Sequence, residues 1–522
     1  MPHIPVLSPD QSEAWDRLAE AAGISRAMLM HAAGQAIAGV IAARQPLAAM
    51  RGVLVAAGSG NNGGDGWVAA RALRRAGMPV WVTSLAGDRS PLCADAARAA
   101  LLDGAREVSP DGPWPAVGLA VDALLGTGAR DAPRPPVATL LERLADLSVP
   151  IIAVDGPTGL DLGTGVVHGA PAVTLSVTFG GVRRGHLLAR DQAGEIVVVD
   201  IGHPAPDPVW PALMSDPIAA AHLPKFRADF HKGDRGRVVI VGGAAGMAGA
   251  ARMAARAAFA TGAGLVHVAG PAETTAVLQA AEPDVQTLVQ PFDAPPGPGL
   301  RRLLERADAV VIGPGLGRDA AGGAGGRREF VRQVIGCSGR VVLDADGLIA
   351  FQGAAGAVAS LVSGRSAVLT PHPGEFRSLW PDLAAAAELD PWGAAEAAAT
   401  QTACTVLLKG VPTVVATRDR AAMTVAAGNP GLATGGSGDL LSGIIATLLA
   451  QGLDCHLAAA VAAHALGRAA ELAARRHTAR AMRPVDVVHA LPDLWREWDV
   501  IARSSRAPRP PVLLELAAPD RV

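Results

Sequence analysis

Short apolar runs alternate with longer stretches of helical periodicity over residues 52–202 of the chain. The runs are GVLVAAG, MPVWVTS, GLAVDALLG, PIIAVDGP, AVTLSVTFG and EIVVVDIG. Continuous apolar runs of this length are typical of strands buried on both faces, and helical segments between them indicate βαβ units with a parallel sheet. The first part of the chain is therefore predicted to be a Rossmann-like, three-layer, doubly wound α/β domain.

The alternation restarts after residues 203–217, HPAPDPVWPALMSDP, which contain five prolines and no hydrophobic period. The later runs are GRVVIVGG, GLVHVAG, DAVVIGPGLG, RVVLDADGL, SAVLTPHPGEF, ACTVLLKG and VPTVVAT. A proline-rich stretch of this kind predicts an extended link between two α/β domains. We expect an N-terminal domain at 1–204, a linker at 205–217, a C-terminal domain at 218–500 and a loosely held tail at 501–522.

Composition narrows the class of protein. Half of the 522 residues are hydrophobic but aromatics make up only 3%, which suits tightly packed α/β layers. The formal net charge of −2 gives no electrostatic footprint for nucleic acid. The four cysteines form no CxxC pair, which disfavours a structural zinc or a disulfide framework. The chain starts without a basic segment followed by an apolar one, so a cytoplasmic protein with no membrane contact is expected.

A single charged residue, Asp439, stands in the glycine-rich stretch GNPGLATGGSGDLLSGI at residues 428–444. Backbone N–H groups in such a loop, together with the dipole of the helix that follows, favour a bound phosphate. A carboxylate beside that phosphate is well placed to accept a proton from an attacking hydroxyl group. Asp439 could instead only cap the helix, but a cap does not explain five glycines within residues 428–438.

Lys409 ends the apolar run of LLKGVPT and is one of only three lysines in the chain, with Lys225 and Lys232. A composition that nearly always uses arginine has kept lysine at this strand end. A compact ammonium group near nucleotide phosphates would explain the choice. The alternative is an exposed lysine whose stem covers the surface.

The motifs GAGLVHVAGP, GPGLG, DADGL, TPHPGEF, LLKGVPT and GNPGLATGGSGDLLSG resemble the ADP- or ATP-dependent NAD(P)H-hydrate dehydratases of the ribokinase-like superfamily, over about residues 225–495. The resemblance implies that an adenine nucleotide with Mg²⁺ binds at Lys409, Gly410, Val411, Pro412, Thr413 and Gly438. It implies that the hydrated nicotinamide lies against Ala263, Gly317, His372 and Asp439. Without the motif, His372 would be an ordinary loop residue, and Gln286 stands where this family usually has methionine.

The stretch VAAGSGNNGGDGWVAARAL at residues 55–73 could be a dinucleotide-binding glycine turn. However, its two asparagines offer side-chain oxygens, and VDALLGTG and VDGPTGLD each place an aspartate, Asp122 and Asp155, at a strand end. Converging oxygen donors suit a hard cation. The alternative is that both aspartates only bond the first turn of the segment that follows each of them.

The set GSGNNGGDG, VDALLGTG, VDGPTG and GEIVVVDIG resembles the NAD(P)H-hydrate epimerase domain over about residues 8–204. The resemblance implies a potassium ion on Asn62, Asp122 and Thr158. The substrate-binding residues that it implies are Asn61, Asn62, Gly63, Gly64, Asp65, Gly126, Thr127, Gly128, Ala129, Arg130, Asp131, Ala132 and Asp155. Two departures are His31 and Ala32, where the family's first helix has an acidic residue and asparagine, and Arg183 and Arg184, where lysine is usual.

The two resemblances together imply one repair function. Hydrated NADH and NADPH carry an added water at the ring carbon next to the nitrogen, and the hydroxyl group exists as two epimers, R and S. The C-terminal half would phosphorylate the S epimer from ADP, or from ATP, with Asp439 as the base, and the ring nitrogen would expel phosphate. The N-terminal half would interconvert the epimers with Asp155 as acid and base.

A homo-oligomer is expected, with these small molecules as partners. The competing hypothesis is a ribokinase-like small-molecule kinase with a non-catalytic N-terminal binding module. That hypothesis leaves the polar residues of the N-terminal half unexplained.

Overall fold

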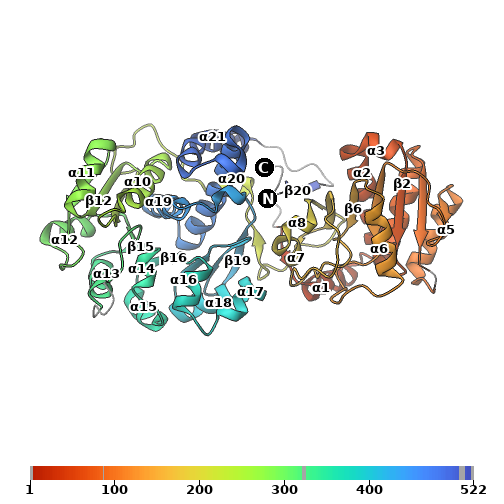
Figure 1. Ribbon diagram of the computed structural model, residues 1–522, viewed down its shortest axis with the longest axis horizontal. Helices are drawn as coiled ribbons and strands as arrows, with labels where there is room; N and C mark the ends of the chain where they lie inside the picture. Colours follow the sequence, from red (N-terminus) through yellow and green to blue (C-terminus); the bar gives the residue numbers. More distant parts are fainter. Residues whose placement is uncertain (1–3, 86, 320–324, 505–511, 519–522) are drawn as a thin grey trace. The chain divides into compact units, whose positions relative to one another are not determined.

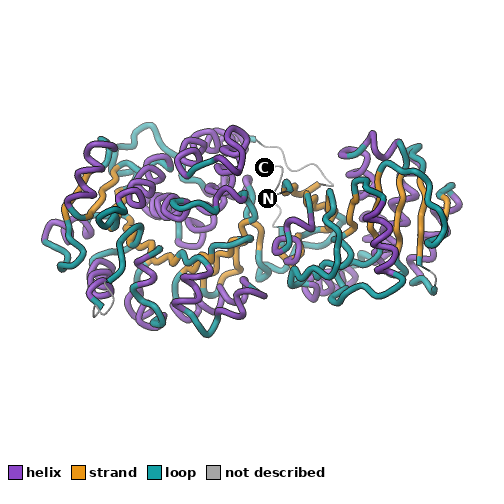
Figure 2. Tube along the Cα trace, in the orientation of Figure 1, coloured by secondary structure: helices purple, strands orange, loops and turns teal. Residues whose placement is uncertain are grey.

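The computed structural model describes residues 4–85, 87–319, 325–504 and 512–518 (Figure 1). The described chain divides into two compact units. Residues 4–210 together with 512–518 form the N-terminal unit, and residues 211–504 form the C-terminal unit. Each unit has helices on both sides of a single large sheet (Figure 2).

The described N-terminal unit contains an eight-stranded sheet in the order β20-β9-β7-β6-β5-β2-β3-β4. All of its pairings are parallel except that between β20 and β9. The strands are β2 (Val53–Ala57), β3 (Val80–Ser84), β4 (Arg106–Val108), β5 (Leu119–Ala123), β6 (Ile151–Val154), β7 (Leu175–Phe179), β9 (Glu195–Val199) and β20 (Val512–Leu516). A separate parallel pair joins β1 (Val6–Leu7) to β8 (Val182–Arg183).

Alternate residues of these strands enter two different cores, as the period of two in a strand requires. In β2, Val53, Val55 and Ala57 join one core, and Leu54 and Ala56 join the other. The helices are α1 (Pro9–Ala21), α2 (Arg26–Arg44), α3 (Pro46–Met50), α4 (Asn61–Arg75), α5 (Pro91–Leu102), α6 (Val137–Asp146), α7 (Arg184–Leu188) and α8 (Arg190–Ala193). Helices α2, α4 and α5 cover the first core and α6 the second, which confirms the predicted three layers.

The C-terminal sheet has ten strands among the described residues, in the order β10-β19-β18-β17-β16-β15-β14-β11-β12-β13. Strands β11 to β17 pair in parallel, and β18 and β19 continue the sheet in antiparallel fashion. The strands are β10 (Ala212–Leu213), β11 (Arg237–Val241), β12 (Leu265–Gly270), β13 (Gln286–Val289), β14 (Ala309–Ile312), β15 (Arg340–Leu343), β16 (Ser366–Leu369), β17 (Thr405–Leu408), β18 (Thr413–Thr417) and β19 (Arg420–Val425).

Two groups of helices cover the two faces of this sheet (Figure 1). The first group is α9 (Asp216–His222), α10 (Ala248–Ala260), α11 (Ala272–Ala281), α19 (Ser437–Ala450), α20 (Cys455–Ala481) and α21 (Pro484–Arg503). The second is α12 (Pro298–Glu305), α13 (Gly326–Gly336), α14 (Asp346–Ile349), α15 (Ala355–Val362), α16 (Pro373–Leu379), α17 (Ala384–Leu389) and α18 (Pro391–Thr402). A Cβ on Gly443 of α19 would lie 2.1 Å from the carbonyl oxygen of Ala254 in α10, so this close packing needs glycine.

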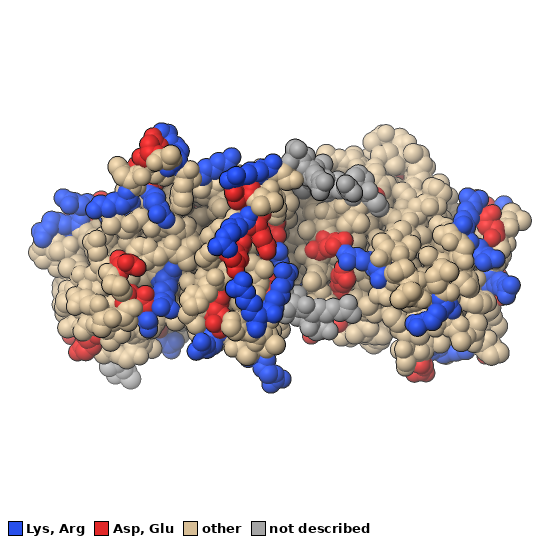
Figure 3. Space-filling model, turned by 90° about the horizontal axis from the view of Figure 1, so that it is seen from above, with Lys and Arg blue, Asp and Glu red and all other residues tan. Residues whose placement is uncertain are grey.

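Within the described chain, α20 is the helix that is long and apolar enough to cross a membrane. However, 78% of its apolar window is buried inside the protein, where it packs against α19 and α21. A long apolar helix that is mostly enclosed by protein is a core helix. On the face shown in Figure 3, basic and acidic side chains are interspersed.

Two segments differ from the expected linker and tail. Ala212–Leu213, inside the expected linker, pairs with β19 and so belongs to the C-terminal sheet. Val512–Leu516, inside the expected tail, pairs with the edge strand β9, and Glu515 forms an ion pair with Arg44. Backbone pairing with a strand far away in the sequence orders both segments, and local composition does not reveal such partners. The expected tail also includes residues 505–511 and 519–522, which lie outside the described residues.

Candidate active sites

The first site lies in the C-terminal unit, at the carboxyl ends of parallel strands β14 to β17. Successive strands run from β11 to β12 and β13 on one side, and from β11 to β14 and beyond on the other. Ligands of open α/β sheets bind outside such a change of direction. Asp344 follows β15, His372 follows β16, Lys409 follows β17, and Asp439 lies in the first turn of α19.

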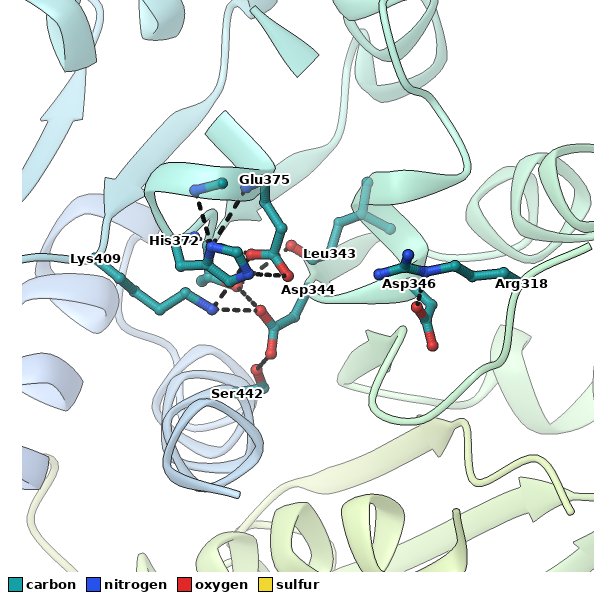
Figure 4. A network of polar contacts seen from close by, with 10 residues as sticks. Arg318, Leu343, Asp344, Asp346, His372, Glu375, Lys409 and Ser442 are labelled. Atoms are coloured by element: carbon teal, nitrogen blue, oxygen red, sulfur yellow. Dashed lines mark hydrogen bonds and ion pairs between the residues drawn. The ribbon is translucent and has the colours of Figure 1, made fainter. Parts of the chain in front are cut away.

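A buried carboxylate, Asp344, is the centre of this site (Figure 4). Its Oδ1 accepts hydrogen bonds from Thr370 Oγ1 at 2.8 Å and from Lys409 Nζ at 2.9 Å. Its Oδ2 accepts one from Ser442 Oγ of α19 at 2.7 Å. Burial lowers the pKa of Lys409, but Asp344 and Glu375 outweigh that effect and hold the pKa above its usual value. Lys409 is therefore a charged ammonium group held inside the site.

His372 begins helix α16 as its N-cap, and Glu375 completes the cap. His372 Nδ1 accepts hydrogen bonds from the N–H groups of Gly374 at 3.0 Å and Glu375 at 3.3 Å. The His372 N–H in turn donates to Glu375 Oε2 at 2.9 Å. The same Oε2 lies 3.6 Å from Lys409 Nζ. This reciprocal cap leaves 56% of the His372 side chain exposed, so its ring can face a substrate.

Asp439 has the most perturbed carboxyl group of this site. Burial, and next the negative charge of Asp344, raise its pKa to about 7, although Lys409 acts in the opposite direction. A carboxyl group with this pKa can both accept and release a proton near neutral pH. A Cβ on the preceding residue, Gly438, would lie 3.5 Å from Lys409 Nζ, so the helix start and the ammonium group are neighbours.

The turn after β15 carries a second carboxylate, Asp346. Its Oδ2 accepts a hydrogen bond from the Gly317 N–H at 2.9 Å, and its Oδ1 lies 3.2 Å from Arg318 Nε. Between the two aspartates, Ala345 has a φ of +49°, a conformation that favours glycine. Strain of this kind is retained where the surroundings require it, often at functional sites.

The second site lies in the N-terminal unit, where β2 and β5 are neighbours and the chain changes direction in the sheet. Asp122 is the penultimate residue of β5, Asp155 follows β6, and helix α4 starts at Asn61 after β2. The loop from Gly126 to Ala132 follows β5. The carboxyl ends of parallel strands meet at one edge, which brings these segments together.

Asp155 is buried and lies beside a buried arginine. Its Oδ1 is 3.2 Å from Arg183 Nη2, and its Oδ2 accepts hydrogen bonds from the N–H and hydroxyl groups of Thr127. Burial raises the pKa of Asp155, but Arg183 and Thr127 outweigh it, so the pKa is lower than usual. Arg183 Nε also donates to Thr127 Oγ1 at 3.2 Å. Asp155 is thus an ionised, firmly oriented carboxylate.

Asp122 is a buried carboxylate with only neutral donors around it. It accepts hydrogen bonds from Leu124 N at 3.2 Å, Thr158 N at 2.8 Å and Thr158 Oγ1 at 2.7 Å. Burial raises its pKa despite these bonds. The Oδ1 of Asn62 lies 3.1 Å from where a Cβ on Gly126 would be, and its Nδ2 finds no hydrogen-bond partner among the described residues.

Comparison with known proteins places both sites in one family. Residues 238–493 match the family model described as NAD(P)H-hydrate dehydratase, and residues 26–185 match that of the YjeF-related protein N-terminus. The chain is 36% identical over 505 residues to the bifunctional NAD(P)H-hydrate repair enzyme Nnr of Escherichia coli, covering 94% of each chain. The chain belongs to the bifunctional NAD(P)H-hydrate repair enzymes.

A second relative and a solved structure are also similar to this chain. The repair enzyme of Salinibacter ruber is 36% identical, covering 94% of this chain and 95% of its own. Among solved structures, an ADP/ATP-dependent NAD(P)H-hydrate dehydratase from Bacillus subtilis, co-crystallised with ATP/Mg²⁺, is 25% identical. It covers 54% of this chain and 97% of its own, with a TM-score of 0.47.

In this repair enzyme, most residues predicted for the dehydratase site come together, but Ala263 does not. Ala263 is buried just before β12, in the core. The carbonyl oxygen of its neighbour Gly262 accepts a hydrogen bond from Gln451, which directly follows α19. Asp439 is twelve residues earlier, about 18 Å away along the helix. The structure therefore does not bring Ala263 next to Asp439, and the role of Ala263 in substrate binding stays a prediction.

In the predicted nucleotide turn, Lys409 to Thr413, the Thr413 hydroxyl bonds the Gly410 carbonyl at 3.1 Å, and Val411 is 76% exposed. Pro412 lies between Val411 and Thr413.

In the N-terminal site, two of the glycines predicted to bind substrate are required by close packing. A Cβ on Gly63 would lie 1.9 Å from the Gly58 oxygen, and one on Gly64 would lie 2.5 Å from Met30.

The loop from Gly126 to Ala132 contributes to the site mainly through Thr127. Gly128 and Ala129 follow it, and Arg130, Asp131 and Ala132 are exposed. Arg130 forms an ion pair with Asp10. These roles leave the substrate-binding assignments as predictions.

No role was predicted from the sequence for Asp344, Glu375 or Ser442, although all three lie in quoted motifs. The signal for Asp344 was available, because it directly follows a buried strand, as Asp155 does. Nor was a role predicted from the sequence for His186, whose Nδ1 accepts a hydrogen bond from Arg183 N at 3.3 Å. Burial lowers the pKa of His186 to about 4, so this imidazole is neutral.

Proposed function

We propose that the enzyme repairs hydrated NADH and NADPH at two sites. The N-terminal site interconverts the R and S epimers, and the C-terminal site dehydrates the S epimer with ADP, giving AMP and phosphate. The observation that carries the proposal is the Asp439 carboxyl group, with its pKa of about 7, beside the Lys409 ammonium group at a helix start. This arrangement binds phosphate and removes a hydroxyl proton in the same place.

In the dehydratase reaction, the substrate hydroxyl oxygen attacks the terminal phosphorus of the nucleotide, Asp439 takes the hydroxyl proton, and AMP leaves. The ring nitrogen's lone pair then breaks the carbon–oxygen bond and releases phosphate. Loss of a proton from the neighbouring ring carbon restores the dihydropyridine. Lys409 balances charge on the transferring phosphoryl group.

Mg²⁺ would enter this site with the nucleotide. The described residues contain no group of three or more His, Cys, Asp or Glu side chains that could hold a metal ion. Mg²⁺ commonly takes most of its ligands from phosphates and water. Such an ion would neutralise phosphate charge, and ATP would serve as donor by the same geometry.

For epimerisation, the bond between the ring nitrogen and the carbon that carries the hydroxyl group must break, with the hydroxyl group becoming an aldehyde, and then re-form on the other face of that carbon. That step needs one group to take a proton and another to give one. Asp155 is ionised beside Arg183, and burial together with Asp155 raises the pKa of Asp65 well above its usual value. Asp155 is the proposed base, and the protonated Asp65 is the proposed proton donor.

A potassium ion fits the oxygen atoms of Asp122, Thr158 and Asn62. The fit rests on Asp122, whose buried charge has three neutral donors and lacks a cationic partner among them. A monovalent cation would balance that charge and fix the strand end next to Gly126.

The cytoplasm remains the proposed location, which the four free cysteines suit. A homo-oligomer remains the proposed state, and gel filtration tests it.

To test the proposed function, each pure epimer of hydrated NADH is incubated with the enzyme in the presence of ADP, in the presence of ATP and without nucleotide. Recovery of the reduced-nicotinamide absorbance should need nucleotide, and the R epimer should be used only as fast as it becomes S. Asp439→Asn should stop recovery but leave interconversion, and Asp155→Asn should do the reverse. Release of a stable phosphorylated product without absorbance recovery would instead show a kinase.

A further inference from the structure

Asp344 connects four elements of the dehydratase site without facing the bulk solvent. It is 1% exposed. Its partners are Thr370 after β16, Lys409 after β17 and Ser442 in α19 (Figure 4). A charged group with this burial is retained only when partners compensate its desolvation. Three donors from three different elements make Asp344 the residue that fixes their mutual positions.

The first turn of α19 rests on the ion pair between Asp344 and Lys409. A Cβ on Gly438 would lie 3.5 Å from Lys409 Nζ and 3.8 Å from Asp344 Oδ2. The next residue is Asp439, and Ser442 one turn later bonds Asp344 directly. A shift of the ion pair would therefore move the turn that carries the base.

The charges around Asp439 are mostly negative. Asp344, Asp346 and Glu375 oppose its ionisation, and Lys409 favours it. Asp346 is partly neutralised by the exposed Arg318, and Glu375 lies 3.4 Å from His372 Nε2. Among the carboxylates, Asp344 has the largest effect on Asp439. The charge of Asp344 therefore has two consequences, one for Lys409 and one for Asp439.

We propose that Asp344 is a positioning residue for phosphoryl transfer, which acts through Lys409 and the first turn of α19 and does not touch the substrate. The proposal rests on the proposed function, because it names how the base and the phosphate-binding ammonium group are held. Asp344 holds the ammonium group at the strand end, close to the helix start. It also keeps Asp439 a stronger base than a lone carboxylate would be.

Three variants test this role: Asp344→Asn, Lys409→Gln and the double variant. In a plot of dehydration rate against pH, the acid limb is the part where the rate rises as Asp439 loses its proton. Asp344→Asn removes a negative charge beside Asp439, so this limb should move to lower pH by about 1 unit. Lys409→Gln removes a positive charge, so the limb should move to higher pH. These opposite shifts are measured at saturating nucleotide.

The KM for nucleotide should rise roughly tenfold in Asp344→Asn, because Lys409 loses its strongest anchor. If Asp344 acts through Lys409, the double variant should have the nucleotide KM of Lys409→Gln within about twofold. Independent, multiplying effects on KM would overturn the proposal. So would an unmoved acid limb in a folded Asp344→Asn enzyme.

Two further variants separate positioning from general stability. Ser442→Ala removes one donor but keeps the charge of Asp344, so the acid limb should stay at its wild-type pH. Asp344→Glu also keeps the charge, and it should keep the limb while raising the nucleotide KM. If Asp344→Asn fails to fold, a shifted limb in Asp344→Glu overturns the proposal. Absence of dehydration by the wild-type enzyme would instead count against the proposed function.

Discussion

Lowering the pH from 8 to 6 should slow nucleotide-dependent dehydration about tenfold, because Asp439 must be ionised to accept the hydroxyl proton. Its pKa is about 7. The ionised fraction is then about 90% at pH 8, about 50% at pH 7 and about 9% at pH 6. Since the active form is the deprotonated one, the rate rises with pH and levels off above the pKa.

The assay is a single turnover with enzyme in excess over the pure S epimer, followed by reduced-nicotinamide absorbance. Asp439→Asn should lower the rate by roughly 10²–10⁴-fold at pH 8 and lose most of the pH limb. The terminal phosphate of the nucleotide also titrates near pH 6. Any dependence of the rate on pH that remains in Asp439→Asn is therefore subtracted from the profile of the wild-type enzyme. Asp155→Asn, the same change at the other site, should keep the limb.

Stability distinguishes this loss from unfolding. The pKa of Asp439 is higher in the folded protein than its usual value of 3.8. The fold therefore opposes ionisation, and the penalty is absent below pH 4 and grows as the pH rises to 7. Asp439→Asn should thus be more stable than the wild type at pH 8, by up to about 4 kcal/mol, and equal to it at pH 4. An active, stable Asp439→Asn enzyme, or a wild-type rate that is flat from pH 6 to 8, would refute the assignment.

Three other changes have defined outcomes. Arg183→Met should raise the pKa of Asp155, so the pH at which epimerisation is half-maximal should move upward, measured by chromatography of the two epimers; an unchanged profile contradicts the ion pair. Asp122→Asn should remove the advantage of K⁺ over tetramethylammonium in epimerisation, because a neutral amide needs no counter-charge. Deleting residues 506–522 should destabilise the N-terminal unit by about 2–4 kcal/mol in denaturant unfolding, whereas Glu515→Gln, which removes only a surface ion pair, should lose under about 1 kcal/mol.

Much of the fold followed from the sequence because its signals are local. Buried parallel strands such as β2 and β15 are uninterrupted apolar runs, and each is followed by helical periodicity. Strand β20 could not be predicted in this way. Its residues Val512–Leu516 gain their order from β9, more than 300 positions earlier, and no pattern within the segment identifies that partner.

The candidate sites divide in the same manner. Asp439, Asp122 and Asp155 stand out because a charged residue directly follows an apolar run or a glycine loop. Ser442 and Thr370 do not, because a hydroxyl group in a helix or after a strand is common. Their importance appears only when the fold brings them within 2.8 Å of Asp344.

The two proposed bases show why residue type and position cannot assign a protonation state. Asp155 is a buried aspartate and Asp439 is a partly buried one, and both lie at the carboxyl edge of a parallel sheet. Arg183 lies beside Asp155 and lowers its pKa, whereas burial, together with the charges of three neighbouring carboxylates, raises the pKa of Asp439 to about 7. The neighbours come from β8 in one case, and from the residue after β15, from α14 and from α16 in the other, so tertiary contacts decide the chemistry. One chain can therefore carry a base with a lowered pKa for epimerisation and a base near its titration point for phosphoryl transfer.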